Sequence, residues 1–288
     1  MKGPRPFNIR IFVAEGMPDG LRLVEKSNWV GLGIICPRGR YAAVKKRAEF
    51  SGSGIYILVG QEGEDGRPTL YIGEAATVRN RLDSHYAKKD FWQKAIIFTT
   101  KGDPLNKAEV QYLEARLVER ASKLKRCQLD NANNPQRPGL SEADEAEVAG
   151  YLDEMLSLLP VIGVDAFESV SETTSDKQRF FLNGSEWEAT GYPTNNGFAV
   201  EAGSIARGRH VPSMPEHVPG DFKKREQLIA DGILIYENER YRFTVEYEFT
   251  SPSLAAAVCK GRSANGRVDW KDANGISLKE HQEREAEV

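Results

Sequence analysis

Short apolar runs separated by turns indicate a series of β-strands in the first hundred residues. Runs rich in Ile, Val, Leu and Tyr that are bounded by Gly, Pro and acidic residues are typical of strands. Between the last two runs, a helical pattern covers residues 77–87, so the central block is predicted to run strand, strand, helix, strand. The predicted strands are Ile9–Val13, Val30–Ile35, Ile55–Val59, Leu70–Gly73 and Ile96–Thr100.

Two longer helices are predicted after this block. Asn106 is a suitable N-cap for a helix over 106–124, and Ser141 for a second helix over 142–159 that Pro160 stops. An Asn- and Pro-rich loop separates the two helices. The apolar residues of the first helix recur at helical spacing, which predicts one buried face: Val110, Leu113, Leu117, Val118 and Ala121.

Composition shifts divide the chain into domains. The polar, turn-prone stretch ESVSETTSDK at residues 168–177 predicts a linker, which we place at 168–178. On its amino-terminal side we expect a β-rich lead-in at 1–50 and a domain of strands and helices at 51–167. On its other side we expect a separate small α+β domain at 179–288. The fold class is therefore α+β.

The carboxy-terminal domain alternates short apolar runs with turns and contains one Ala-rich helix. Thr250, Ser251 or Ser253 is expected to cap that helix, and Gly261 to end it. Trp187 and Trp270 are expected to pack in or near the core of this domain rather than to stack on bases. The charged tail after Lys279 is expected to be frayed.

Charge and cysteine usage narrow the class of protein. The net charge of −3 gives no global indication of a nucleic-acid partner, but residues 71–126 carry 12 Lys and Arg against 7 Asp and Glu. Residues 141–175 carry 9 acidic residues and no Lys or Arg. This arrangement fits either a phosphate-binding face or ordinary surface charge.

Three cysteines lie far apart without a CxxC pair, which argues against a disulfide framework and a structural zinc site: Cys36, Cys127 and Cys259. No apolar segment approaches the roughly 20 residues of a membrane span, and the first residues lack the apolar core of a signal peptide. We therefore expect a cytoplasmic protein that does not bind membranes.

Two tyrosines in a predicted hairpin are the first candidates for chemistry. Tyr56 and Tyr71 lie in adjacent strands, where their hydroxyls can reach one end of a small sheet, although a cross-strand packing pair fits the same pattern. In the following helix, Arg81 and His85 are four residues apart and share one face. Arginine suits phosphate oxygens and histidine can move a proton near neutral pH, but a solvated helix face would look alike.

Glu114 is the third candidate. It lies among core-facing residues of the 106–124 helix, where a carboxylate is expensive to bury without a partner or a metal ion. A single carboxylate with several waters would suit Mg²⁺. A salt bridge to a Lys or Arg one helical turn away is the alternative.

Taken together, these motifs resemble the GIY-YIG nucleases. The matching elements are GIY at 54–56, YIG at 71–73, Arg81-Leu82 with His85, LEARL around Glu114, and Asn131 in LDNANNP. They occur in the order of that family, which includes homing endonucleases, restriction enzymes and the incision subunit of bacterial nucleotide excision repair. The resemblance covers residues 51–135. Flanking stretches resemble a bacterial subgroup with a carboxy-terminal domain of unknown function.

The resemblance implies a fold and an activity. The fold would be a small antiparallel three-stranded sheet flanked by helices. The activity would be that of a metal-dependent endonuclease, which hydrolyses phosphodiester bonds in a nucleic acid, expected to be DNA, with one Mg²⁺ or Mn²⁺ held by Glu114. The implied catalytic residues are Tyr56, Tyr71, Arg81, His85 and Glu114, and the implied substrate-binding residues are Gly73, Glu74, Arg79 and Asn131.

Several alternatives stay open at this point. A non-catalytic nucleic-acid-binding module on the same fold and a nuclease acting on RNA both fit the motifs. Many relatives have Lys directly after YIG, whereas this chain has Glu74, whose negative charge would repel substrate unless it binds metal or points away. The sequence does not determine which tyrosine acts as the base, the specificity for substrate or the oligomeric state.

Overall fold

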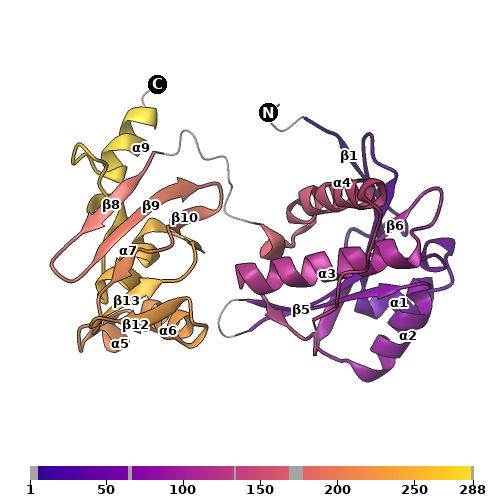
Figure 1. The fold of residues 1–288 in the computed structure, drawn as a ribbon, viewed down its shortest axis with the longest axis horizontal. Helices are drawn as coiled ribbons and strands as arrows, with labels where there is room; N and C mark the ends of the chain where they lie inside the picture. The colour runs from indigo at the N-terminus through magenta and orange to yellow at the C-terminus, as the bar shows by residue number, and fades with distance from the viewer. Residues whose placement is uncertain (1–5, 64–66, 133, 169–177, 287–288) are drawn as a thin grey trace. The chain divides into compact units, whose positions relative to one another are not determined.

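A computed structural model of the chain describes residues 6–63, 67–132, 134–168 and 178–286. The chain divides into two units, Met1–Glu168 and Ser169–Val288, which we call the amino-terminal and the carboxy-terminal unit (Figure 1). The division falls at the predicted linker at 168–178, of which residues 169–177 lie outside the described residues.

The amino-terminal unit is built on one seven-stranded sheet in the order β1-β2-β3-β6-β4-β5-β7. All neighbours are antiparallel except β5 and β7, which are parallel. The strands are β1 (Ile9–Val13), β2 (Arg22–Lys26), β3 (Gly31–Pro37), β4 (Gly54–Glu62), β5 (Pro68–Ala75), β6 (Trp92–Thr100) and β7 (Gln128–Leu129).

The sheet is larger than the three strands that the resemblance implies. The three expected strands, β4, β5 and β6, are present and antiparallel, but β3 pairs with β6 from Gly31 opposite Thr100 to Pro37 opposite Lys94. Strands β1 and β2 then extend the sheet beyond β3. The first 50 residues therefore belong to the same sheet as the central strands, because the apolar residues of β3 are buried against β6.

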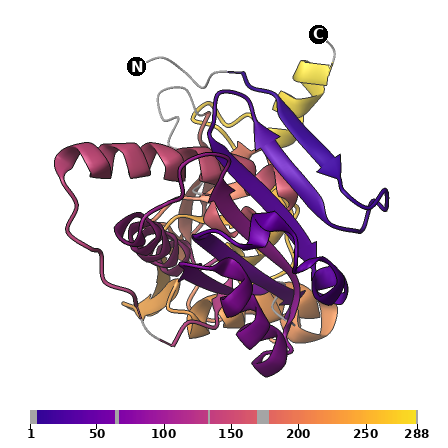
Figure 2. The same ribbon diagram turned by 90° about the vertical axis from the view of Figure 1, so that its right-hand side faces the viewer.

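Helices cover both faces of the central strands. In Figures 1 and 2, α3 (Lys107–Leu124) and α4 (Glu142–Leu158) lie on one side, and α1 (Arg38–Val44) and α2 (Val78–Lys88) lie on the other. Because both faces are covered, the first seven residues of β4 are all buried, which explains its unbroken apolar run. Alternate side chains enter two cores: Ile55 and Ile57 face α3 and α4, whereas Tyr56 and Leu58 face α1 and α2.

The two long helices of this unit, α3 and α4, begin where local capping chemistry predicts. The Asn106 side chain accepts a hydrogen bond from the Glu109 backbone, and the Glu109 carboxylate accepts one from the Asn106 backbone, which forms a complete capping box. Ser141 caps α4 by accepting from the backbone N–H of Asp144. α3 and α4 therefore match the predicted helices to within one residue.

The carboxy-terminal unit is a second α+β arrangement around a curled antiparallel half-barrel, in the order β12-β13-β11-β9-β10-β14 with β8 paired to β9. Its strands are β8 (Phe180–Asn183), β9 (Glu188–Thr194), β10 (Gly197–Val200), β11 (Ile205–Ala206), β12 (Leu234–Glu237), β13 (Arg240–Phe243) and β14 (Tyr247–Phe249). Its helices are α5 (Met214–His217), α6 (Pro219–Ala230), α7 (Pro252–Lys260), α8 (Gly266–Asp269) and α9 (Leu278–Ala286).

The Ala-rich helix α7 lies at the centre of this unit. Ser251 caps it and Gly261 ends it in the left-handed conformation, as predicted. Trp270 is fully buried and its indole N–H donates to the Pro252 carbonyl, so its role is packing. Against the expectation of a frayed tail, the chain after Lys279 is helical as far as Ala286, in the helix α9 that Leu278 anchors in the core. Among the described residues, no helix is long and apolar enough to cross a membrane.

Candidate active site

Tyr56, Tyr71 and His85 meet beside the central strands. The Tyr56 hydroxyl lies 2.9 Å from Nε2 of His85, and the Tyr56 and Tyr71 rings stack with centroids 6.2 Å apart. The His85 ring lies 4.8 Å from that of Tyr71. The register explains the tyrosine pair: Tyr56 is opposite Gly73, two residues from Tyr71, so both phenols are diagonal neighbours on the face that α2 covers.

The members of this cluster differ in burial, and burial shifts the pKa values of Tyr56 and His85. Tyr56 is fully buried, and burial raises its pKa well above the ordinary value for tyrosine. Burial, with the positive charges of Lys89 and Arg81, lowers the pKa of His85 to about 4. Tyr71 is half-buried and its ring contacts the Lys89 ammonium at 4.7 Å. At neutral pH Tyr56 is therefore protonated and His85 an uncharged imidazole, and Tyr71 is the more accessible of the two tyrosines.

Gly73 is required by the position of Tyr56. A Cβ atom at Gly73 would lie 2.3 Å from the Tyr56 hydroxyl oxygen and 2.5 Å from Cζ of the same ring. The resemblance implied a substrate-binding role for Gly73. Its observed contribution is to leave room for the buried phenol.

Arg81 and Arg79 project from α2 in different surroundings. Arg81 is exposed one turn before His85, and its charge acts on Tyr56, His85 and Glu114. Arg79 is half-buried near Asp83, and its carbonyl oxygen lies 3.0 Å from the Tyr41 hydroxyl. The Asp83 carboxylate also accepts from Lys45 at 2.8 Å. These contacts fix α2 against α1 and so hold Arg81 and His85 in place.

Glu114 lies half-buried on α3 beside Glu74 of β5. Burial raises the pKa of Glu114, the negative charge of Glu74 raises it further, and a hydrogen bond from the Glu74 backbone opposes the rise. The Glu74 side chain is 13% exposed and forms an ion pair with Lys107, the first residue of α3. The other Glu74 oxygen, Oε2, is buried without a hydrogen-bond partner among the described residues.

Asn131 extends the hydrogen-bonding of the sheet. Its Oδ1 accepts from the Ile72 N–H at 3.0 Å, and its Nδ2 donates to the Ile72 carbonyl at 2.7 Å. The preceding strand β7 ends at Leu129, opposite Leu70. The Asn131 amide therefore continues the β7 pairing as far as Ile72. The resemblance implied that Asn131 binds substrate, but in the structure both polar atoms of its side chain are hydrogen-bonded to β5.

The outer edge of β5 separates the residues on one face of the sheet from those on the other. Beyond Ile72, no described strand pairs with the outer edge of β5. Tyr56 and Tyr71 face α2, whereas Glu74, which is opposite Ile55, faces α3. The charges of Arg81 and Glu114 nevertheless both act on Tyr56. Tyr56, Tyr71 and His85 are therefore in contact, and Arg81 and Glu114 are close enough for their charges to act on this cluster.

Two lysines of the site escaped the sequence-based prediction. Lys107 precedes Glu114 by seven residues, so both lie on one face of α3. This spacing could have indicated that Lys107 lies on the same side of the helix as Glu114. Lys89 follows His85 by four residues, contacts the Tyr71 ring and pairs with Asp130. Lys107 forms an ion pair with Glu74, whose charge acts on Glu114. Lys89 forms an ion pair with Asp130, whose charge acts on His85.

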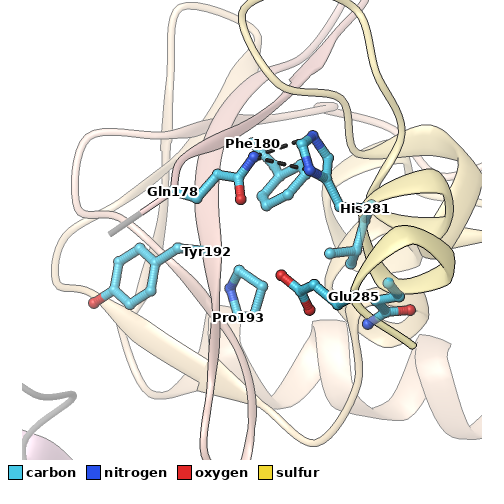
Figure 3. Close-up of a pocket in the computed structure, with 8 residues that line it drawn as sticks. Gln178, Phe180, Tyr192, Pro193, His281 and Glu285 are labelled. Atoms are coloured by element: carbon cyan, nitrogen blue, oxygen red, sulfur yellow. Dashed lines mark hydrogen bonds between the residues drawn. The ribbon is translucent and has the colours of Figure 1, made fainter. Parts of the chain in front are cut away.

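The described residues contain no group of three or more His, Cys, Asp or Glu side chains that would hold a metal ion by themselves. In the carboxy-terminal unit, a cavity of about 320 Å³ is lined by eight residues (Figure 3): Gln178, Phe180, Tyr192, Pro193, Leu278, His281, Gln282 and Glu285. His281 contacts Gln178 and also lies 2.9 Å from Asp272, which fixes its ring. No sequence motif predicted this cavity.

The comparison with known families concerns the carboxy-terminal unit. Residues 180–282 match the family described as a domain of unknown function (DUF4357). The match covers most of the predicted domain at 179–288 and does not reach the candidate active site. No curated protein and no solved structure matches the chain.

Proposed function

We propose that the amino-terminal unit is a cytoplasmic, metal-dependent endonuclease of the GIY-YIG type, which hydrolyses phosphodiester bonds in DNA. The observation that carries the proposal is the convergence of Tyr56, Tyr71 and His85 in direct contact, with the charges of Arg81 and Glu114 acting on the same cluster. These residues come from two strands and two helices. A packing cluster of aromatic residues has no need of a half-buried carboxylate and an exposed arginine beside it.

Phosphodiester hydrolysis requires an oriented water and a cation for the charge that develops on the phosphate oxygens. Tyr71 is the more accessible tyrosine of the cluster, so we propose that its hydroxyl orients the attacking water. Arg81 is exposed and permanently charged, so we assign its guanidinium to the phosphate oxygens. Tyr56 is too deeply buried to touch substrate, and it acts as a positioning residue through its hydrogen bond with His85.

The carboxylates fit the divalent cation that the resemblance implies. Glu114 is a half-buried carboxylate with a raised pKa, and Glu74 beside it has a buried oxygen without a partner in the described structure. Oxygen ligands are what Mg²⁺ and Mn²⁺ prefer, and Mg²⁺ keeps several waters. Glu114 would hold the ion with Glu74 beside it, and a bound ion would supply Lewis-acid stabilisation of the leaving oxygen.

A cleavage assay tests the proposal. The full-length protein is incubated with supercoiled plasmid, linear duplex, single-stranded DNA and RNA, each with Mg²⁺, with Mn²⁺ and with a chelator. We expect metal-dependent cleavage of DNA. If the protein binds these nucleic acids but cleaves none of them with any metal, the nuclease activity is refuted and the non-catalytic binding module is favoured. If it cleaves RNA alone, the substrate is RNA and not DNA.

A further inference from the structure

The ion pair between Glu74 and Lys107 joins β5 to the first residue of α3 at the proposed metal site. The Lys107 side chain is 60% exposed, whereas that of Glu74 is 13% exposed. An exposed lysine gains little from an ion pair, since its ammonium remains well solvated when the pair opens. The ammonium can therefore leave, but the carboxylate stays buried beside Glu114.

The charges around this pair are unbalanced without Lys107. The negative charge of Glu74 and the positive charge of Lys107 act on Glu114 in opposite directions. Glu74 uses one oxygen for Lys107, and its buried Oε2 has no partner among the described residues. Two adjacent carboxylates repel each other, and the Lys107 ammonium pairs with only one of them, while the charge of Arg81 also acts on Glu114. A divalent cation would offset both, and it would repel the ammonium.

We propose that Lys107 is the internal counter-ion of the Glu74–Glu114 carboxylate pair and is displaced when a divalent cation binds. The inference rests on the proposed function for the identity of the cation. It also accounts for glutamate directly after the YIG motif, because Lys107 neutralises Glu74 in the metal-free protein. Lys107 and the metal ion then compete for the same carboxylate.

Competition predicts two effects of opposite sign for Lys107→Met, which keeps most of the apolar stem. Without metal, loss of the counter-ion should lower the unfolding temperature, because the mostly buried Glu74 carboxylate then lacks its ion-pair partner while the charge of Glu74 still acts on Glu114. In the same variant, Mn²⁺ should bind about two- to fivefold more tightly, which is the range expected when an exposed ion pair no longer competes. An ion pair with a purely structural role would lower the unfolding temperature without any gain in metal affinity.

The experiment measures Mn²⁺ binding to the full-length protein by electron paramagnetic resonance of free Mn²⁺, with no nucleic acid present. Lys101→Met is the matched control, since Lys101 is also a partly exposed lysine of this unit and pairs with Glu25 at 3.3 Å. It should leave Mn²⁺ affinity unchanged. Glu74→Gln should weaken Mn²⁺ binding, and adding Lys107→Met to Glu74→Gln should give no further gain in affinity.

The outcomes separate this inference from the proposed function. If the wild type binds Mn²⁺ and cleaves DNA but Lys107→Met binds Mn²⁺ no more tightly, the counter-ion role is wrong and the nuclease stands. If the wild type binds Mn²⁺ and Lys107→Met binds it more tightly but neither protein cleaves nucleic acid, the counter-ion role stands and the nuclease falls. A wild type that binds no Mn²⁺ overturns the counter-ion role.

Discussion

Replacing Gly73 by alanine should disrupt the tyrosine cluster from the opposite strand. The added Cβ would lie 2.3 Å from the Tyr56 hydroxyl oxygen, more than 1 Å short of ordinary contact, which begins at 3.4 Å. Tyr56 is fully buried on β4 and directly opposite Gly73, so its ring has no free space to enter. The phenol must shift and lose its 2.9 Å contact with His85.

The size of the effect follows from these contacts. Overpacking a core by one methyl group costs about 1–3 kcal/mol, and a lost hydrogen bond adds roughly 1 kcal/mol. The unfolding free energy of the amino-terminal unit should fall by about 2–4 kcal/mol. Cleavage should fall by about 10²-fold, because a displacement of about 1 Å in a reacting group has an effect of this order.

Denaturant unfolding and single-turnover cleavage test this prediction on one pair of variants. Gly39→Ala is the control: Gly39 lies in α1, a Cβ there meets nothing within 4 Å, and alanine favours the helix. It should leave stability and cleavage equal to or above wild type. A Gly73→Ala protein as stable as wild type would refute the packing argument. A destabilised Gly73→Ala protein with full cleavage would refute the dependence of the chemistry on Tyr56.

Three further changes test other parts of the site. Arg81→Ala should reduce single-turnover cleavage by about 10²-fold or more but weaken DNA binding in Ca²⁺ far less, and equal losses in both would contradict its assigned role. Asn131→Ala should lower the unfolding free energy by about 1–3 kcal/mol, because it leaves the N–H and carbonyl of buried Ile72 unpaired; unchanged denaturant unfolding would contradict this. The pKa of His85 is lowered to about 4, so the unfolded chain binds a proton that the folded chain does not between about pH 6.5 and 4, and stability should fall as pH decreases through this window. Between pH 7 and pH 5 the loss should be at most about 2 kcal/mol and absent from His85→Gln, which parallel denaturant curves at the two pH values would measure.

Local sequence determined the elements whose ends depend on near neighbours. The capping box of Asn106 and Glu109 and the cap of Ser141 involve residues only three positions apart, so the starts of α3 and α4 could be predicted. The apolar runs likewise predicted the central strands, because period and composition are properties of a single segment. Five of the site residues could be proposed because their types and order resemble those of a known nuclease family.

Tertiary structure decided which segments pair and which groups share the site. The size of the sheet depends on β3 pairing with β6, and the covering of β5 depends on Asn131 reaching Ile72, contacts between residues far apart in the chain. Local patterns carry no information about such contacts, since an apolar strand fits any open edge of a sheet. The same reason hid the Glu74–Lys107 ion pair: the charge of each residue is visible in the sequence, but only the packing of α3 on β5 brings the two together.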